Sequence, residues 1–350
     1  MEYHYRKIER GIFSAADFQS FQKCPALQEL KEFVKKCGDS VINTKRSDVK
    51  DLPPTVSRLI DMLRTLNRWI DEIPPLNQPM RFGNKAFRTW NERLCSEGPG
   101  LLEQVAQRNN PMMCVELAGY LEESFGNPTR IDYGTGHETT FIIFLYCLYK
   151  VGLLQDSDLK AVVLKVFTAY LAVCRHLQRT YWLEPAGSHG VWSLDDYQML
   201  VFYFGACQLH GNDSFDPKCI CDKRLMEEEA GEYMYFEAIH YINTTKKGYF
   251  YETSPMLYDI SGAKSWSKIC SGMYKMWCNE VLGKFPVVQH LRFGSIFPLN
   301  WTPSENPATK EYAHISPPSI EVKSMPENFT KAPWAKYCCL FHKTVRTIGS

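Results

Sequence analysis

Residues 55–73 of the 350-residue chain read TVSRLIDMLRTLNRWIDEI, and this stretch decides the fold class. Its apolar residues recur at steps of three and four, which places them along one side of an α-helix. Pro74 and Pro75 follow at once and end that helix, because proline lacks the N–H group that a helix interior needs. The apolar stripe consists of Val56, Leu59, Ile60, Leu63, Leu66, Ile70 and Ile73.

The same helical spacing continues along most of the chain, whereas few segments alternate as strands do. We therefore predict an all-α protein with at most one small β-hairpin. Extended structure is expected at residues 287–293 and 249–251 only. The predicted helices are residues 15–37, 55–73, a short helix after Asn84, 111–125, 137–153, 158–181, 193–209, 226–243 and 264–282.

Two stretches interrupt the helical pattern. Residues 210–224 are polar, with scattered glycine, aspartate and proline, and are predicted to form a loop. Prolines recur from Trp301 onward and rule out long helices there. We therefore expect an N-terminal extension at 1–13, a large helical domain at 14–300 and a mostly irregular tail at 301–350.

Composition narrows the classes of partner. With 40 Lys and Arg against 39 Asp and Glu, the net charge is +1, and nothing demands the basic face of a nucleic-acid-binding protein. The longest apolar run, Phe141 to Tyr149, is much shorter than the roughly 20 residues that span a bilayer. The first residues do not resemble a signal peptide. We expect no nucleic acid and no membrane as partners, and a location in the cytoplasm or the nucleus.

The 13 cysteines point to an intracellular protein, since they are odd in number and scattered through apolar stretches. Most are expected to pack as small core residues. The close pairs, Cys219 with Cys221 and Cys338 with Cys339, lack the second pair or the nearby histidines that a zinc site requires. A zinc site is therefore disfavoured.

Residues 130–138, RIDYGTGHE, combine two glycines with the start of a long apolar helix. The N–H groups of a first helical turn lack intrahelical acceptors and carry a partial positive charge. Gly134 and Gly136 would let an anion approach that backbone, and Arg130 could add a bidentate charged contact. A phosphate site is one interpretation; a tight turn capped by Thr135 is the other. The Walker pattern GxxxxGK[ST] is absent.

Residues 184–196, EPAGSHGVWSLDD, bring two adjacent carboxylates to a predicted helix start. The simpler interpretation is a capping box that begins at Ser193. Alternatively, Asp195 or Asp196 is a ligand for Mg²⁺ shared with nucleotide phosphates, but not both, because adjacent helical side chains face different ways. Residues 285–294, FPVVQHLRFG, could line a pocket or form a strand against the core. The sequence has no G-x-S-x-G elbow and no kinase H-R-D or D-F-G motif, so no catalytic residue is assigned.

Together these three segments resemble the phosphotyrosyl phosphatase activator family, whose members activate serine/threonine protein phosphatase 2A and are also described as peptidyl-prolyl cis/trans isomerases. Residues 81–88, RFGNKAFR, and 266–268, WSK, are similar to two more stretches of that family. The resemblance extends from about residue 14 to residue 300. It implies a single all-helical fold of core, linker and lid subdomains, with a nucleotide in a deep pocket between them.

The resemblance implies that ATP and Mg²⁺ are the cofactors. Gly190 and Asp196 match the positions associated with Mg²⁺, which selects Asp196 over Asp195. The positions that match ATP contacts are Arg130, Thr135, Gly136, Gln289, His290 and Leu291.

A partner surface is implied in the same way. Val191 and Glu252 match positions on the surface that contacts the phosphatase. The family often has Gln where this chain has His189 and Gly where it has Ser193. Neither difference removes a ligand, and His189 adds a titratable group beside the expected pocket.

Three functions stay open at this point. The resemblance implies an activator that binds the catalytic subunit of phosphatase 2A with ATP-Mg and shifts it to the active, metal-competent conformation. It also implies an isomerase of proline-containing peptides, which needs only a groove that binds the twisted peptide better than either planar form. Trp192, Phe293 and Tyr133 are candidates to line that groove. The third hypothesis is a helical interaction module with a degenerate nucleotide pocket.

Overall fold

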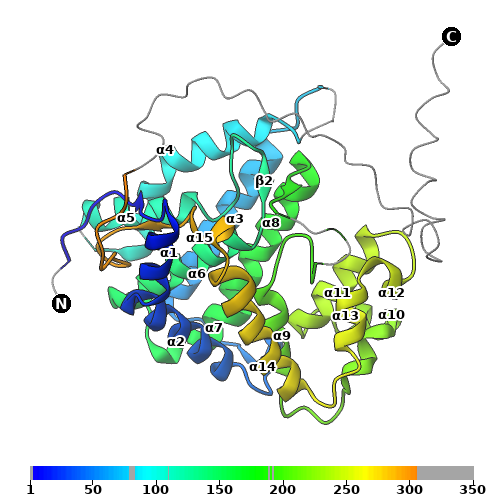
Figure 1. Ribbon diagram of the computed structural model, residues 1–350. Helices are drawn as coiled ribbons and strands as arrows, with labels where there is room; N and C mark the ends of the chain where they lie inside the picture. The colour runs from blue at the N-terminus through cyan, green and yellow to red at the C-terminus, as the bar shows by residue number, and fades with distance from the viewer. Residues whose placement is uncertain (1–2, 79–82, 109, 188–189, 191–192, 306–350) are drawn as a thin grey trace, which may run out of the picture. The chain divides into compact units, whose positions relative to one another are not determined.

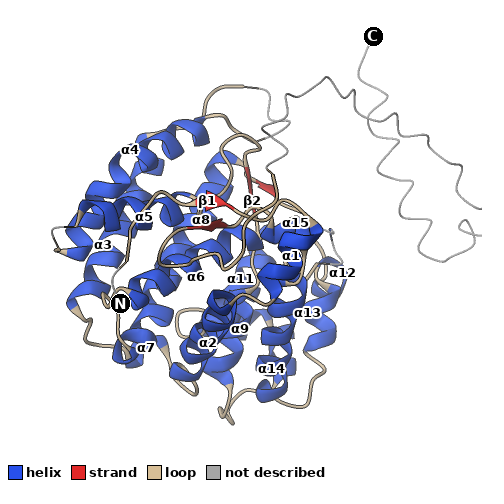
Figure 2. Ribbon diagram, turned by 60° about the vertical axis from the view of Figure 1, so that its left-hand side comes forward, coloured by secondary structure: helices blue, strands red, loops and turns tan. Residues whose placement is uncertain are grey.

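The stripe at residues 55–73 forms helix α3 (Pro54–Glu72), and its apolar residues from Val56 to Ile70 are buried. α3 packs against α4 (Ala86–Ala106) and α8 (Thr168–Tyr181). The computed structural model describes residues 3–78, 83–108, 110–187, 190 and 193–305, and helices dominate this part of the chain (Figure 1; Figure 2). The prediction of an all-α protein is confirmed.

Most of the other helices are short, and several are linked through 3₁₀ or π turns. Up to Lys150 the elements are α1 (Ala15–Gln22), α2 (Pro25–Ser40), the 3₁₀ helix η1 (Arg46–Asp48), α5 (Pro111–Glu122) and α6 (Thr135–Lys150). Beyond it lie η2 (Asp156–Asp158), α7 (Leu159–Ala161), the π-helix η3 (Val162–Phe167), α9 (Leu200–Leu209), η5 (Pro217–Cys221), α10 (Lys223–Glu229), α11 (Met234–Thr245), α12 (Phe250–Thr253), α13 (Pro255–Ile260), α14 (Trp266–Met276), the π-helix η6 (Trp277–Leu282) and α15 (Phe285–Val288).

Some predicted helix boundaries are wrong. Ser14 caps α1 as expected, but the predicted helix at 15–37 is divided into α1 and α2, because Pro25 occupies the first turn of a new helix. The predicted helix at 226–243 is likewise divided between α10 and α11. The stretch expected as a loop at 210–224 contains η5 and the start of α10.

The small strands join segments that are far apart in the sequence. β1 (Glu9–Arg10) pairs antiparallel with β4 (Arg292–Phe293), and β2 (Asp132–Tyr133) pairs in parallel with β3 (Glu184–Pro185). The extended segment expected at 287–293 is therefore mostly wrong, since α15 and a turn precede β4. The expected strand at 249–251 is also wrong, because α12 begins at Phe250.

Two helices are apolar on almost every side and lie within the core. All ten residues of α9 are buried, as is the run from Glu138 to Leu148 in α6. A helix without a polar face must be surrounded by other elements, and α9 packs against α2, α11 and α14. In the described part of the chain no helix is long and apolar enough to cross a membrane.

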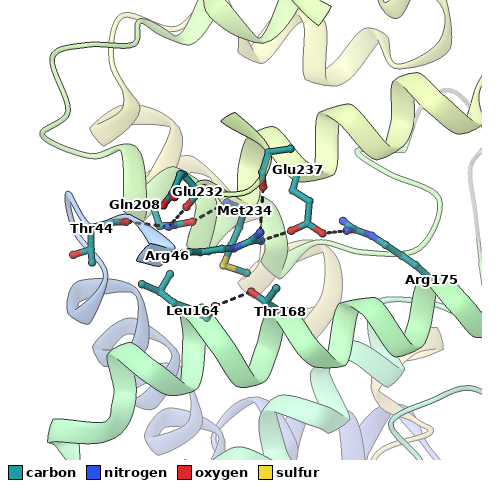
Figure 3. A network of polar contacts seen from close by, with 10 residues as sticks. Thr44, Arg46, Leu164, Thr168, Arg175, Gln208, Glu232, Met234 and Glu237 are labelled. Carbon is teal, nitrogen blue, oxygen red and sulfur yellow. Dashed lines mark hydrogen bonds and ion pairs between the residues drawn. The ribbon is translucent and has the colours of Figure 1, made fainter. Parts of the chain in front are cut away.

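A buried polar network attaches α11 to the rest of the fold (Figure 3). The Glu237 carboxylate lies between the guanidinium groups of Arg46 and Arg175 and pairs with both. These two positive charges hold its pKa below the usual range even though burial acts in the opposite direction. Nearby, Gln208 in α9 donates to the carbonyl oxygens of Thr44 and of Glu232 and accepts from the N–H of Met234.

Candidate functional site

The first and second segments lie side by side because the β2–β3 pairing joins them. The N–H of Glu184 donates to the carbonyl of Ile131 at 2.9 Å, and the N–H of Ala186 donates to that of Tyr133 at 2.8 Å. A Cβ built on Gly134 would come 2.9 Å from the carbonyl oxygen of Ala186. Glycine is therefore required at 134, where the first segment meets the second.

The third segment meets the first at its second glycine. A Cβ built on Gly136 would come 3.3 Å from Cγ1 of Val287, two residues before the predicted contact Gln289. Figure 1 shows α15, which contains Val287, beside α6, which contains Gly136. The three segments therefore converge around the N-terminus of α6, although about 150 residues separate the first from the third.

Thr135 and Gly136 are the first two residues of α6, and both are half-buried. Gly134, not Thr135, is the N-cap, so the interpretation of Thr135 as a capping residue is wrong. An α-helix does not use the N–H groups of its first turn internally. The three segments thus lie around a helix N-terminus, and such N-termini can bind anions.

Arg130 already has an anionic partner. Its Nε lies 2.6 Å from Oδ2 of Asp132 and its Nη2 lies 3.2 Å from Oδ1, which makes a bidentate pair. Asp132 is buried, Arg130 is exposed, and Nε2 of His137 lies 4.0 Å from the same carboxylate. A phosphate bound by Arg130 would share the guanidinium with Asp132, an arrangement that the sequence analysis did not foresee.

His290 is exposed on the turn that follows α15, whereas Leu291 is buried. Desolvation of the ring, followed by the positive charges of Arg130 and Arg10, lowers the pKa of His290 to about 4. The imidazole is therefore neutral at neutral pH and can both donate and accept a hydrogen bond. The side chain of Arg10 in β1 donates from Nε to the carbonyl of Gln289 at 3.0 Å, which holds this turn in place.

The second segment turns before it becomes helical. The predicted helix start at Ser193 is wrong, because Oδ2 of Asp195 accepts from the N–H groups of Tyr197 and Gln198, both at 3.0 Å, and α9 begins only at Leu200. This Asx turn competes with a helix for the same backbone groups. It also points the Asp195 carboxylate at its own backbone.

Asp196 faces a different neighbour. Its Oδ2 lies 2.9 Å from Nζ of Lys246, and both side chains are about three-quarters buried. Gly190 has a φ of 61°, in the left-handed region that favours glycine, and a Cβ there would meet open space. The predicted contact Val191 and the neighbouring His189 lie outside the described residues.

The donor set fits magnesium bound together with a nucleotide. In the described residues no group of three His, Cys, Asp or Glu side chains could hold a metal by itself. Mg²⁺ usually takes one or two protein carboxylates and fills its other positions with phosphate oxygens and water. Asp196 can supply the carboxylate. The N-terminus of α6, with Gly134 and Gly136, can hold the phosphates.

Glu138 is a site residue that the sequence analysis missed. Its side chain is fully buried in the first turn of α6, and Oε2 accepts from the N–H groups of Met199 and Leu200 at 2.9 and 3.0 Å. Burial raises the pKa of this carboxyl group to about 8. Its Oε1 has no hydrogen-bond partner within the described part of the chain. Glu138 thus joins the N-terminus of α6 to that of α9.

Glu252 is exposed on the short helix α12, which Figure 1 shows well to one side of α6 and α15. Tyr251, its chain neighbour, and Tyr249, three residues before it, are exposed and stack with their ring centroids 5.5 Å apart. Tyr258 of α13 packs edge-on against Tyr251 at 6.0 Å and is also exposed. The segment that leads into this tyrosine surface contains Lys246, the partner of Asp196.

The proposed groove residues are part of the core. Tyr133 is fully buried and its hydroxyl lies 2.8 Å from that of Tyr170. Phe293 is buried and stacks on Phe297 with centroids 5.4 Å apart. Neither ring is available to a peptide, and Trp192 lies outside the described residues.

Comparisons with known proteins identify the family of this chain. The protein-family model described as "Phosphotyrosyl phosphate activator (PTPA) protein" matches residues 8–299. The chain is 43% identical over 292 residues to the probable serine/threonine-protein phosphatase 2A activator 1 of Dictyostelium discoideum, which covers 83% of this chain and 90% of that protein. It is 38% identical over 314 residues to the serine/threonine-protein phosphatase 2A activator of Drosophila melanogaster, covering 89% and 78%.

A solved structure shows the same fold. The crystal structure of the PP2A phosphatase activator Ypa1 superposes with a TM-score of 0.80 and 35% sequence identity, covering 85% of this chain and 96% of that one. The resemblance of the three segments is thus supported along nearly the whole helical domain. From the family match, the identities and the shared fold, we conclude that this chain belongs to the PTPA family.

Proposed function

We propose that the chain activates serine/threonine protein phosphatase 2A by binding its catalytic subunit together with ATP-Mg. The observation that carries the proposal is the convergence of the three segments on the N-terminus of α6, at Gly134 and Gly136. The relatives from Dictyostelium discoideum and Drosophila melanogaster that are named as phosphatase 2A activators support the choice of partner.

In this proposal, the N–H groups at Thr135 and Gly136 bind the phosphates, and Arg130 contributes a charged contact while remaining paired with Asp132. The side chains of Gln289 and His290 and the backbone of the turn from Gln289 to Leu291 would contact the other side of the nucleotide, while the Leu291 side chain is buried. Asp196 would hold Mg²⁺, which would supply positive charge to the phosphates. In this structure Nζ of Lys246 lies 2.9 Å from Oδ2 of Asp196. A metal held by Asp196 would compete with Lys246 for this carboxylate, and Lys246 lies at the start of the segment that leads to Glu252.

The tyrosine surface around Glu252 is the proposed contact with the phosphatase. Aromatic side chains are enriched in protein interfaces because they bury a large area at a small entropic cost. Tyr249, Tyr251 and Tyr258 are exposed neighbours of Glu252. Binding one conformation of the catalytic subunit more tightly than the others would shift its population toward the active, metal-competent form.

Calorimetric titration of ATP-Mg into the full chain tests the nucleotide part of this proposal. We expect Asp196→Ala to weaken binding by about tenfold or more, since Mg²⁺ would lose its protein carboxylate. Glu184→Gln is the matched control, because it removes an exposed carboxylate on β3, at the other end of the same segment. Equal heats for wild type and Asp196→Ala would favour the degenerate-pocket hypothesis.

Peptidyl-prolyl isomerase activity is a second proposed function and rests on the family resemblance. Because Tyr133 and Phe293 are buried, a peptide groove must be built from other residues. The activity requires only preferential binding of the twisted X-Pro bond. A proline-peptide isomerisation assay, with an identically purified inactive protein to exclude bacterial isomerases, tests it; a rate equal to that of buffer rejects the proposal.

A further inference from the structure

Two cysteines from different helices, α9 and α14, meet where these helices pack together. Cys207 lies near the end of α9 and Cys270 in the middle of α14, and these two helices pack against each other. Their Sγ atoms are 2.8 Å apart, closer than two unbonded sulfur atoms normally approach and not far above the ~2.05 Å of a disulfide bond. Both cysteines are free thiols in this structure.

The surroundings hold Cys207 in this position. α2 brings Gly38 against Cys207, and a Cβ added to Gly38 would come 3.0 Å from the Cys207 sulfur. Cys207 is buried, so its sulfur cannot turn outward to solvent, whereas Cys270 is partly exposed. An oxidant therefore reaches the Cys270 sulfur first, and the Cys207 sulfur is the nearest group that can react with the product.

The two thiols also differ in acidity. The hydrogen bond from the Cys207 thiol stabilises a thiolate on Cys270 and lowers the pKa of Cys270. The same contact, together with burial, raises the pKa of Cys207. Since a thiolate is the reactive form, Cys270 is the better nucleophile of the pair.

We propose that Cys207 and Cys270 form a reversible disulfide when the protein meets a peroxide. The Cys270 thiolate attacks one oxygen of hydrogen peroxide, the O–O bond breaks, and Cys270 sulfenic acid and hydroxide form. The Cys207 sulfur then attacks the sulfenic sulfur, loses its proton and displaces the hydroxyl group as water. In total two thiols lose two electrons and two protons, and the peroxide becomes two molecules of water.

The disulfide would connect the supports of two site segments. α9 begins with Leu200, whose N–H donates to Glu138, the last residue of the first segment. α14 continues through η6 directly into the third segment. The bond closes a loop between positions separated by 63 residues, which constrains the unfolded chain and stabilises the folded one. This inference does not depend on nucleotide or phosphatase binding.

The test exposes the full chain, reduced beforehand, to graded hydrogen peroxide. Remaining thiols are then alkylated, the protein is digested without reduction, and peptides are mapped by mass spectrometry. We expect a crosslinked peptide joining Cys207 to Cys270, together with a rise in the melting temperature of about 5 °C that dithiothreitol reverses. The variants Cys207→Ser and Cys270→Ser should lose both signals. Cys278→Ser, which removes another partly exposed thiol in the adjoining turns, should keep them.

Two results would overturn the proposal. One is that both thiols remain fully alkylated at a peroxide concentration that already oxidises the exposed Cys95 and Cys221. The other is that the crosslinked peptide or the melting shift persists in Cys270→Ser, which would assign the reaction to other cysteines. Because Cys270 is partly exposed, its serine variant should fold even if Cys207→Ser does not.

Discussion

Gly136 and Val287 lie so close together that a single added carbon on the glycine would come 3.3 Å from a methyl group of the valine. This contact brings a helix N-terminus from the first segment against the third segment, and the β2–β3 pairing brings in the second. The site is thus built by long-range contacts between three loops, each of which is only weakly informative by itself.

Gly136→Ala tests whether the space at this contact is needed for a ligand. The alanine favours helix formation but crowds Val287, so we expect the free energy of unfolding to change by less than about 1 kcal/mol. The Cβ would keep a phosphate away from the first-turn N–H groups, so the Kd for ATP-Mg, measured by calorimetry, should rise by about tenfold. Gly100→Ala in α4, where a Cβ meets nothing within 4 Å, is the control. Wild-type affinity in Gly136→Ala would contradict the assignment.

Glu138 predicts an unusual dependence of stability on pH. Burial raises the pKa of Glu138 to about 8, whereas an unfolded glutamate titrates near ~4.3. Between these values the folded state holds a proton that the unfolded state has lost, so stability falls as pH rises. Titration of Glu138 lowers the free energy of unfolding by at most about 1.4 kcal/mol per pH unit, and this decrease ends above pH 8.

Glu138→Gln should remove this decrease of the free energy of unfolding with pH, because glutamine does not titrate. Glutamine keeps an acceptor for the N–H groups of Met199 and Leu200. Chemical denaturation from pH 5 to pH 8.5 measures it for both proteins. Burial also raises the pKa of Asp195, but that effect is present in both proteins and largely cancels in the difference. Parallel stability curves would show that Glu138 is ionised in the folded protein.

Gly205 sets the distance between α9 and α11. A Cβ at this position would come 2.7 Å from both Cα and Cβ of Tyr235, and the backbone of α11 cannot easily move aside. We expect Gly205→Ala to lower the free energy of unfolding by about 1–3 kcal/mol. Gly272→Ala in α14, which faces open space, should instead raise it by up to about 1 kcal/mol. Urea denaturation of both variants compares them, and equal effects would refute the close approach.

Glu252→Lys reverses an exposed charge beside Tyr251 of the tyrosine surface. If this surface contacts the phosphatase, capture of the catalytic subunit by immobilised protein should fall by about tenfold, which corresponds to about 1.4 kcal/mol. Glu103→Lys, an exposed charge reversal on α4, should leave capture unchanged. Loss of capture in both variants would indicate a general effect of net charge, and loss in neither would reject this surface.

The helices were predictable because their apolar spacing is local, as in α3. The turn at Asp195 was not, because the same residues fit a helix cap, and only tertiary packing selects the Asx turn. The prediction of an extended segment at 287–293 was wrong for a similar reason, since a short apolar run is compatible with a strand or with one helical turn.

The candidate site was predictable only in part. The glycines of the first segment indicated an anion site, but the spacing could not show that Asp132 already pairs with Arg130 or that Lys246 pairs with Asp196. Glu138 follows the glycines directly in the sequence and resembled an ordinary acidic residue in a first helical turn. Its burial depends on where α9 lies, and that is a property of the folded chain.

The most direct test of the account is the activation of metal-depleted phosphatase 2A catalytic subunit by this protein with ATP and Mg²⁺. Wild type, Asp196→Ala and the control Glu184→Gln would be compared at equal concentrations. The account predicts that wild type and Glu184→Gln restore phosphatase activity only when ATP-Mg is present, and that Asp196→Ala restores at most about a tenth as much. Full activation by Asp196→Ala, or by wild type without nucleotide, would contradict it.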